Sequence, residues 1–219
     1  MSQQKGRPTD KWLKPLVNRV QRWLARRRVR RRALQALTHA EPGKRIEAAR
    51  FLATTTLSPS EIHTLIQAMD DPNPFVRWEI GEALIAQGPR HVLGACLRRV
   101  YEGREGAGIA AAVRVLGVLG DERALPALVQ LTEHPDPEVR VALAHALRAF
   151  AEHPSAQEAL HALLRDDHPT VRRATIWTLR DINVSWAHRA LAQRASEEPV
   201  SWLRHLLRTA PVATEEATS

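Results

Sequence analysis

Histidine and cysteine are the residue types in this sequence whose chemistry could extend beyond packing. The 219-residue chain has ten histidines and one cysteine, Cys96. No two histidines stand four residues apart, the spacing that brings two imidazoles to one helix face as metal ligands. Cys96 follows the run Val-Leu-Gly-Ala, whereas a reactive thiol needs a cationic and open setting. We therefore expect no metal site, no cofactor and a Cys96 that belongs to the core.

A glycine-rich segment is a weak candidate for phosphate binding. Residues 103–108 are Gly-Arg-Glu-Gly-Ala-Gly, without the Lys-Ser/Thr ending of a phosphate loop. A turn between two helices accounts for these glycines. No nucleophile and base occur at any local spacing, so the sequence favours a protein that is not an enzyme, and no small-molecule substrate is evident.

Tryptophan and arginine are stronger candidates because they are enriched in the hot spots of protein interfaces. They recur two, six and nine residues after the first position of several similar segments, and a helix places these positions opposite its core face. Packing of the rings on arginine stems or on neighbouring segments is the alternative explanation. We expect the following residues to bind a partner on a concave face: Arg50, Trp78, Glu82, Arg114, His145, Arg148, Arg173, Trp177, Arg180 and Trp202.

The elements that would position these residues form an internal repeat. Segments beginning at Val76, Val139 and Val171 share Val-Arg and a leucine eight residues after the valine, and each follows a turn containing Asp and Pro. Weaker copies begin at residues 44 and 108. A constant period of this length indicates a repeat architecture. The marker leucines stand at spacings of 32, 32, 31 and 32 residues: Leu52, Leu84, Leu116, Leu147 and Leu179.

A second amphipathic segment separates each pair of marker segments. In residues 61–69 the apolar residues recur at three- and four-residue steps, which is typical of a helix with one buried stripe. Each unit is then two antiparallel helices of about ten to thirteen residues, and only stacked units can bury their apolar faces. We predict an all-α fold: an α-solenoid of about five to six antiparallel helix pairs over residues 34–208, with a disordered tail at 209–219.

The pattern Asp-Pro-x-x-x-Val-Arg-x-x-x-x-x-Ala-Leu resembles the short HEAT-like repeats of phycobilisome-lyase-type proteins, over about residues 40–208. The resemblance implies that the repeated arginines, which are Arg45, Arg77, Arg140 and Arg172, pair with aspartates between the helices rather than bind anions. Asp71, Asp136 and Asp167 stand at suitable places. Deoxyhypusine hydroxylase, an enzyme built on such repeats, binds its di-iron centre through His-Glu dipeptides. This sequence has none, which argues against a metal oxygenase.

Charge divides the chain at residue 33. Residues 1–33 have twelve basic residues and one acidic residue, net +11, whereas residues 34–219 have 20 and 23, net −3. Apolar residues from Trp12 to Leu24 recur on one face of a helix, and a run of arginines follows. We expect residues 1–33 to form a basic amphipathic N-terminal helix, the arm, with these contact residues: Trp12, Arg19, Arg22, Trp23, Arg26, Arg27, Arg28, Arg30, Arg31 and Arg32.

Three roles for the arm stay open at this point. Its apolar face would cap the exposed end of the solenoid, or would enter the headgroup region of an anionic membrane while the arginines attract the lipid charge. In the third role the arginines bind nucleic-acid phosphates or an acidic protein.

These patterns together favour a non-enzymatic scaffold or adaptor that binds a protein partner on its concave face and makes a second contact through the arm. A single cysteine, no apolar run long enough to span a membrane and no secretory signal favour the cytoplasm, with a location at the membrane periphery as the alternative. Other functions of HEAT-like proteins give two further alternatives, a nucleic-acid binder similar to the alkylpurine DNA glycosylases and a bilin-lyase-like enzyme. The net charge of −3 on residues 34–219 weighs against nucleic acid.

Overall fold

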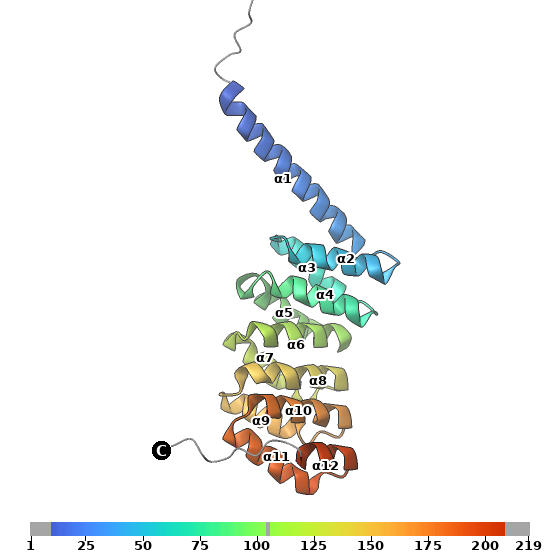
Figure 1. The fold of residues 1–219 in the computed structure, drawn as a ribbon, viewed down its shortest axis with the longest axis vertical. Coiled ribbons are helices and arrows are strands. Elements are labelled where there is room, and N and C mark those ends of the chain that lie inside the picture. The colour runs from blue at the N-terminus through green and yellow to red at the C-terminus, as the bar shows by residue number, and fades with distance from the viewer. Residues whose placement is uncertain (1–9, 104–105, 209–219) are drawn as a thin grey trace, which may run out of the picture.

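The computed structural model describes residues 10–103 and 106–208 and builds them from helices stacked along the long axis of the molecule (Figure 1). Within these ranges there is no β-strand, and the predicted all-α solenoid is confirmed. The α-helices are α1 (Asp10–Ala36), α2 (Pro42–Ala53), α3 (Pro59–Gln67), α4 (Pro74–Ile85), α5 (Pro89–Glu102), α6 (Gly106–Leu119), α7 (Leu125–Val129), α8 (Pro137–Ala146), α9 (Pro154–Leu163), α10 (Pro169–Ile182), α11 (Ser185–Glu197) and α12 (Ser201–Arg208). Short 3-10 helices cover Ala68–Asp70, Glu122–Ala124, Gln130–Glu133 and Leu147–Phe150.

The turns that precede the marker segments lead directly into the N-terminal ends of helices. Seven helices begin with proline, which fits the first helical position because its missing N–H would be unpaired there anyway. The Asn73 side chain accepts hydrogen bonds from the amides of Phe75 and Val76, and Asp136 accepts one from the amide of Glu138. The Asn-Pro and Asp-Pro turns therefore set the first residue of α4 and of α8.

The marker segments form one layer of the stack. Helices α2, α4, α6, α8 and α10 pack on one another in chain order, and α3, α5, α7 and α9 form the other layer. All five marker leucines are buried, at 0% exposure. The sequence period therefore arises because each unit buries one leucine between the two layers.

The second helix of the third unit is shorter than predicted. Each helix of a unit was expected to have about ten to thirteen residues, but the five-residue α7 lies between 3-10 helices at Glu122–Ala124 and Gln130–Glu133. Pro126 accounts for the late start of α7, because a proline lacks the amide that a helix interior requires and is tolerated only in the first turn. The apolar residues Leu125, Leu128 and Leu131 are still buried.

Helix α1 crosses the predicted boundary at residue 33. The Nε of Arg30 donates to the Glu61 carboxylate at 2.7 Å, Leu34 packs against the core, and Leu37 is buried just beyond the helix. The rest of α1 runs away from the stack (Figure 1). The end of α1 thus covers the first repeat, while its earlier turns do not. The predicted tail at 209–219 lies outside the described residues.

Candidate partner-binding face

Cys96 and the glycine-rich segment, which the sequence offered as candidates for chemistry, lie in the core and at the start of a helix. Cys96 is completely buried, and this burial raises the pKa of its thiol to about 12. In the part of the chain that the structure describes, no three His, Cys, Asp or Glu side chains gather as metal ligands. The predicted turn at residues 103–108 falls at the start of α6, although Arg104 and Glu105 lie outside the described residues.

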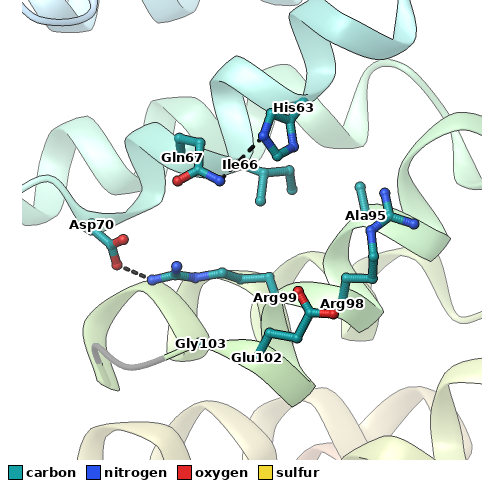
Figure 2. Close-up of a pocket in the computed structure, with 9 residues that line it drawn as sticks. All are labelled: His63, Ile66, Gln67, Asp70, Ala95, Arg98, Arg99, Glu102 and Gly103. Carbon is teal, nitrogen blue, oxygen red and sulfur yellow. Dashed lines mark hydrogen bonds and ion pairs between the residues drawn. The ribbon is translucent and has the colours of Figure 1, made fainter.

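A polar hollow of about 390 Å³ lies between α3 and α5 (Figure 2). Arg99 on its floor pairs with Asp70, and His63 lies within reach of Gln67, with their nitrogens 3.4 Å apart. The Nε of Arg99 is buried without a hydrogen-bond partner among the described residues. A ligand in this hollow would have to compete with Asp70 for the guanidinium, so these charges serve the contact between α3 and α5.

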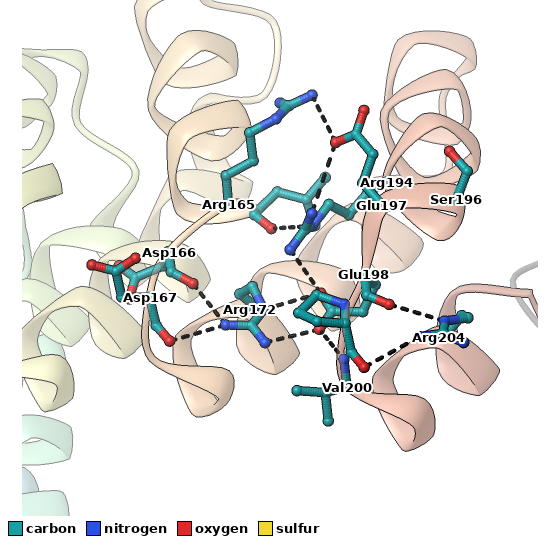
Figure 3. A network of polar contacts seen from close by, with 12 residues as sticks. Arg165, Asp166, Asp167, Arg172, Arg194, Ser196, Glu197, Glu198, Val200 and Arg204 are labelled. Carbon is teal, nitrogen blue, oxygen red and sulfur yellow. Dashed lines mark hydrogen bonds and ion pairs between the residues drawn. The ribbon is translucent and has the colours of Figure 1, made fainter.

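The repeated arginines form ion pairs that connect successive units. Both Nε and Nη2 of Arg45 donate to the carboxylate of Asp71, at 2.6 and 2.9 Å. Arg140 binds Asp166 in the same way at 2.7 and 2.9 Å. Arg172 binds Glu198 at 3.0 and 2.8 Å (Figure 3). In each case the carboxylate stands 26 residues after the arginine. These arginines are structural, as the resemblance implies, and are occupied before any external anion arrives.

Two of the three expected aspartates are not the partners. Asp136 caps α8 instead, and Asp167 gives only its backbone carbonyl to Arg172, because the preceding residue, Asp166, is the one whose carboxylate reaches Arg140. The partner of Arg172 is a glutamate, whose longer side chain spans the same gap. The expectation of a strict Arg-Asp pattern was therefore wrong at these positions.

The series of ion pairs is interrupted at the third unit. The residue 26 positions after Arg77 is Gly103, and Arg77 donates instead to Glu138 at 3.0 Å and to backbone carbonyls before α4. The arginine position of α6 is Ile109 because this copy of the repeat has lost Val-Arg. A Cβ added at the neighbouring Gly108 would overlap Arg99 and Asp70, whose own ion pair occupies that space.

Four of the predicted contact residues gather around α6. The guanidinium of Arg114 lies 3.9 Å from the centre of the Trp78 ring. It also donates to the Glu82 carboxylate at 2.8 Å and to the Trp78 carbonyl at 2.9 Å. The indole of Trp78 is nevertheless 54% exposed. Arg114 therefore fixes Trp78 from one side and leaves much of the ring open to a partner, and His145 lies beyond α6 on α8.

Trp78 borders a groove of about 470 Å³ that crosses α4, α6 and α8. Its lining is mostly apolar, and the exposed Val118 extends it along α6. The hollow exists because α6 has alanine where α4 has Trp78 and α8 has Val141. We call it the α6 groove, and these residues line it: Pro74, Arg77, Trp78, Ala107, Ala110, Ala111, Arg114, Val118, Glu138, Val141, Ala142 and His145.

His145 on α8 and Arg148 in the 3-10 helix that follows continue this groove. A second hollow of about 370 Å³ shares Arg114, Val118 and His145 with the first and reaches Arg148. Burial removes water from around the imidazole and lowers the pKa of His145, although the negative charge of Asp181 acts in the opposite direction. His145 is therefore neutral at pH 7, and the wall that it provides carries no charge.

The remaining predicted contact residues lie outside both hollows. Trp177 is 48% exposed with Arg180 over its ring at 5.0 Å, and Trp202 on α12 is 49% exposed. Arg173 is exposed on α10, and Arg50 pairs with Glu79 at 2.7 Å. The structure thus brings Trp78, Glu82, Arg114, His145 and Arg148 together and leaves the others as separate positions along the stack.

Sequence reasoning missed the small residues that create the groove. Ala107, Ala110 and Ala111 attracted no attention because alanine carries no chemistry, yet their size makes the hollow. The signal was present in the run from Gly106 to Ala112, which contains one large side chain, Ile109.

The structure describes the side chains of only some of the predicted arm residues. The side chains of Trp12, Arg22, Trp23 and Arg26 lie outside the described residues. Arg30 pairs with Glu61. The other members are exposed: Arg19, Arg27, Arg28, Arg31 and Arg32.

Comparison with known proteins finds a family match for the part of the chain that contains α6 and α8 but not for α4 and its Trp78. Residues 104–180 match the family model of HEAT repeats. This confirms the resemblance to HEAT-like repeats, whereas the phycobilisome-lyase type stays a prediction. HEAT repeats generally mediate protein–protein interaction.

Two solved structures and the curated proteins complete the comparison. The chain is similar to two engineered proteins whose crystal structures were determined by the Northeast Structural Genomics Consortium. The first is 19% identical, with 82% of this chain and 93% of that chain covered and a TM-score of 0.45. The second is 22% identical, with coverage of 82% and 95% and a TM-score of 0.45. No curated protein matches the chain. Among the described helices none is long and apolar enough to cross a membrane.

Proposed function

We propose that this HEAT-repeat protein is a non-enzymatic scaffold or adaptor that binds a segment of a partner protein in the α6 groove. The observation that carries the proposal is the exposed Trp78 at the edge of an apolar hollow with an alanine floor. Contiguous exposed apolar surface on a soluble domain marks interaction sites, and tryptophan beside a pocket is a frequent hot spot.

The charged residues around the groove suit a protein interface. Arg77 is paired with Glu138, and Arg114 with Glu82, so that the apolar floor has a rim of polar groups that are already satisfied. Interfaces commonly combine an apolar centre with such a rim. A partner can therefore fill the groove with apolar side chains without stripping water from unpaired charges.

The size of the groove limits what fills it. A hollow of about 470 Å³ takes a few large side chains rather than a whole domain. The exposed Trp177 and Trp202 lie further along the stack, towards its C-terminal end. We propose that the partner segment anchors in the α6 groove and extends across the other members of the predicted concave face.

Nucleic acid fits this face less well. A phosphate backbone requires free cations, but the carboxylates of Glu82 and Glu138 already neutralise Arg114 and Arg77. The groove also offers an apolar floor that phosphates would not use.

Affinity purification followed by mass spectrometry tests the proposal with matched aromatic variants. Trp78→Ala removes the groove tryptophan, whereas Tyr101→Ala removes an aromatic residue that is 60% exposed on α5, in the other layer. We expect the partner to be recovered with the wild type and Tyr101→Ala. Trp78→Ala should weaken binding by about thirtyfold, the effect of losing a typical hot spot.

A second variant separates the groove from Trp78 itself. Val118→Glu places a charge on the apolar wall at a side chain that is 59% exposed, so the fold should tolerate it. Equal recovery of the partner with folded Trp78→Ala and Val118→Glu would show that binding does not use the groove.

A further inference from the structure

The exposed side of α1 carries an arrangement that the groove does not explain. Val20 and Leu24 are 47% and 49% exposed, although both are apolar. At 100° per residue, Val20, Leu24 and Arg31 fall within about 40° of one another and form a line along the helix. In the sequence the same apolar period continues towards the N-terminus through residues 13–17.

The solenoid does not cover this line. The contacts of α1 with the first repeat include Arg30 and Leu34 near its end, and Ala25, Arg27 and Val29 border the hollow beside α2. Ala25, Val29 and Arg30 lie about 80° or more around the helix from Val20, whereas Leu34 lies about 40° from it but about four turns further along, where α1 meets the core. Figure 1 shows α1, a helix about 40 Å long, running away from the stack, and Val20, Leu24 and Arg31 are all exposed on it.

The charge of α1 indicates which kind of partner could bind the exposed line. Residues 10–36 contain ten basic residues and one acidic residue, a net charge of +9. A second copy of α1 packed against this line would bring like charges together. Nucleic acid would satisfy the arginines but offers nothing apolar for Val20 and Leu24. An anionic bilayer supplies both partners, because its headgroups are negative and its acyl chains begin a few ångström below them.

We propose that α1 binds peripherally to an anionic phospholipid surface, with Val20 and Leu24 inserted at the headgroup level and the arginines on the lipid phosphates and carboxylates. An apolar face and a basic cluster together give a stable peripheral contact, where one alone does not. No described helix can cross the bilayer, so the contact lies on its surface.

Vesicle flotation of the full chain tests the proposal. Vesicles of phosphatidylcholine alone are compared with vesicles that also contain phosphatidylserine, each at low and high salt. We expect flotation with phosphatidylserine only, weakened by salt. Flotation that is equal on both vesicle types would overturn the charge-based recognition, and no flotation at all would overturn the proposal.

Two variants separate the charge from the insertion. Replacing Arg19, Arg28, Arg31 and Arg32 by glutamine should lower partitioning by about a hundredfold or more, since each arginine contributes about fivefold near such a surface. The matched control removes four exposed arginines from the repeats, Arg90, Arg98, Arg173 and Arg189, and should float like the wild type. Val20→Ser with Leu24→Ser keeps every charge and should lose about tenfold.

Four measurements complete the test. Equal thermal unfolding by circular dichroism shows that the variants are folded. Flotation of Val20→Ser/Leu24→Ser at the wild-type level would overturn insertion. Binding to duplex DNA at the same salt, without flotation, would assign the arginines to nucleic acid instead. Trp78→Ala should float normally, because this surface is separate from the α6 groove.

Discussion

Arg172 and Glu198 form an ion pair that is almost completely removed from water, with side chains 6% and 0% exposed. Arg194 adds a second contact to the same carboxylate at 3.0 Å. Such a pair is weak evidence for stability as a whole, but removing one partner leaves a buried charge without compensation. The energetic importance of these residues therefore shows only when the pair is broken.

Arg172→Ala should lower the free energy of unfolding by about 3 kcal/mol, at the low end for a broken buried pair because Arg194 still contacts Glu198. The adjacent exposed residue supplies the control, and Arg173→Ala should change stability by less than about 0.5 kcal/mol. Urea unfolding followed by circular dichroism measures both. Equal midpoints for the two variants would show that Arg172 does not stabilise the stack.

The Arg140–Asp166 pair makes stability depend on pH. Burial alone would raise the pKa of Asp166, but hydrogen bonds from the Arg140 side chain and the His168 amide outweigh it and lower the pKa below its ordinary value. A carboxyl whose pKa is lower in the folded state stabilises the fold above its ordinary pKa near 4 and loses this contribution as pH falls through the folded-state value.

Arg140→Gln should therefore be destabilised at pH 7, and its difference from the wild type should shrink as pH falls below about 4. Urea midpoints measured from pH 7 to pH 3 check this, with the exposed Arg189→Gln as the control for charge. A difference that stays constant over this range would mean that Asp166 is not the titrating partner.

Single residues also show what the sequence could and could not predict. The position of Cys96 and the marker leucines followed from apolar neighbours and period, and the structure buries them all. The partners of the arginines did not follow, because a turn such as Asp166-Asp167 offers two carboxylates and period alone does not select between them. The choice depends on where each side chain points in three dimensions.

At the scale of elements, α6 and α8 pack closely because Gly117 has no side chain. A Cβ added at Gly117 of α6 would lie 2.5 Å from the Cα of Ala146, which is backbone of the neighbouring helix and cannot move aside cheaply. Gly94 in the interior of α5 differs, because a Cβ there would meet only the end of the Arg98 side chain, at 3.9 Å. Close packing therefore requires glycine at position 117 but not at position 94.

Gly117→Ala should destabilise the protein by about 1–3 kcal/mol through overpacking. Gly94→Ala should stabilise it by about 0.5–1 kcal/mol, because alanine is the better helix former and has room. Thermal or urea unfolding of both variants provides the comparison. A stabilised Gly117→Ala would show that α6 and α8 pack less closely than the structure describes.

Helices were easier to predict than their interruptions. Apolar residues at three- and four-residue steps identified both layers of the stack, but the late start of α7 required attention to Pro126 rather than to period. The α6 groove could not be predicted from chemistry-bearing residues, since its depth comes from alanines and only the order of helices across the face shows that they adjoin Trp78.

At the scale of the whole molecule, the division between arm and repeats follows the packing of α1 rather than charge. The charge pattern placed the boundary at residue 33, inside α1, although Arg30 on the arm side already pairs with Glu61 of the first repeat. Charge counts depend on composition alone, whereas the boundary depends on which side of α1 meets the stack.

Two truncated chains locate the boundary. A chain beginning at Val29 keeps Arg30, Leu34 and Leu37 and should unfold at the temperature of the full chain. A chain beginning at Thr38 loses the buried Leu37 and the Arg30–Glu61 pair, and it should lose about 2–4 kcal/mol. Circular dichroism melts of the two chains check this. Equal melting temperatures for both would place the whole of α1 outside the folded unit.

The constant separation of 26 residues between each arginine and its carboxylate restricts how the gene can change. One inserted residue adds up to about 3.5 Å of chain, enough to carry a carboxylate out of hydrogen-bond range. The spans 45–71, 140–166 and 172–198 therefore resist changes of length. The corresponding span, which starts at Ile109, has no such pair, and it overlaps the 31-residue step from Leu116 to Leu147, where the other steps are 32. Insertions and deletions among related sequences should accumulate there and between Arg77 and Gly103.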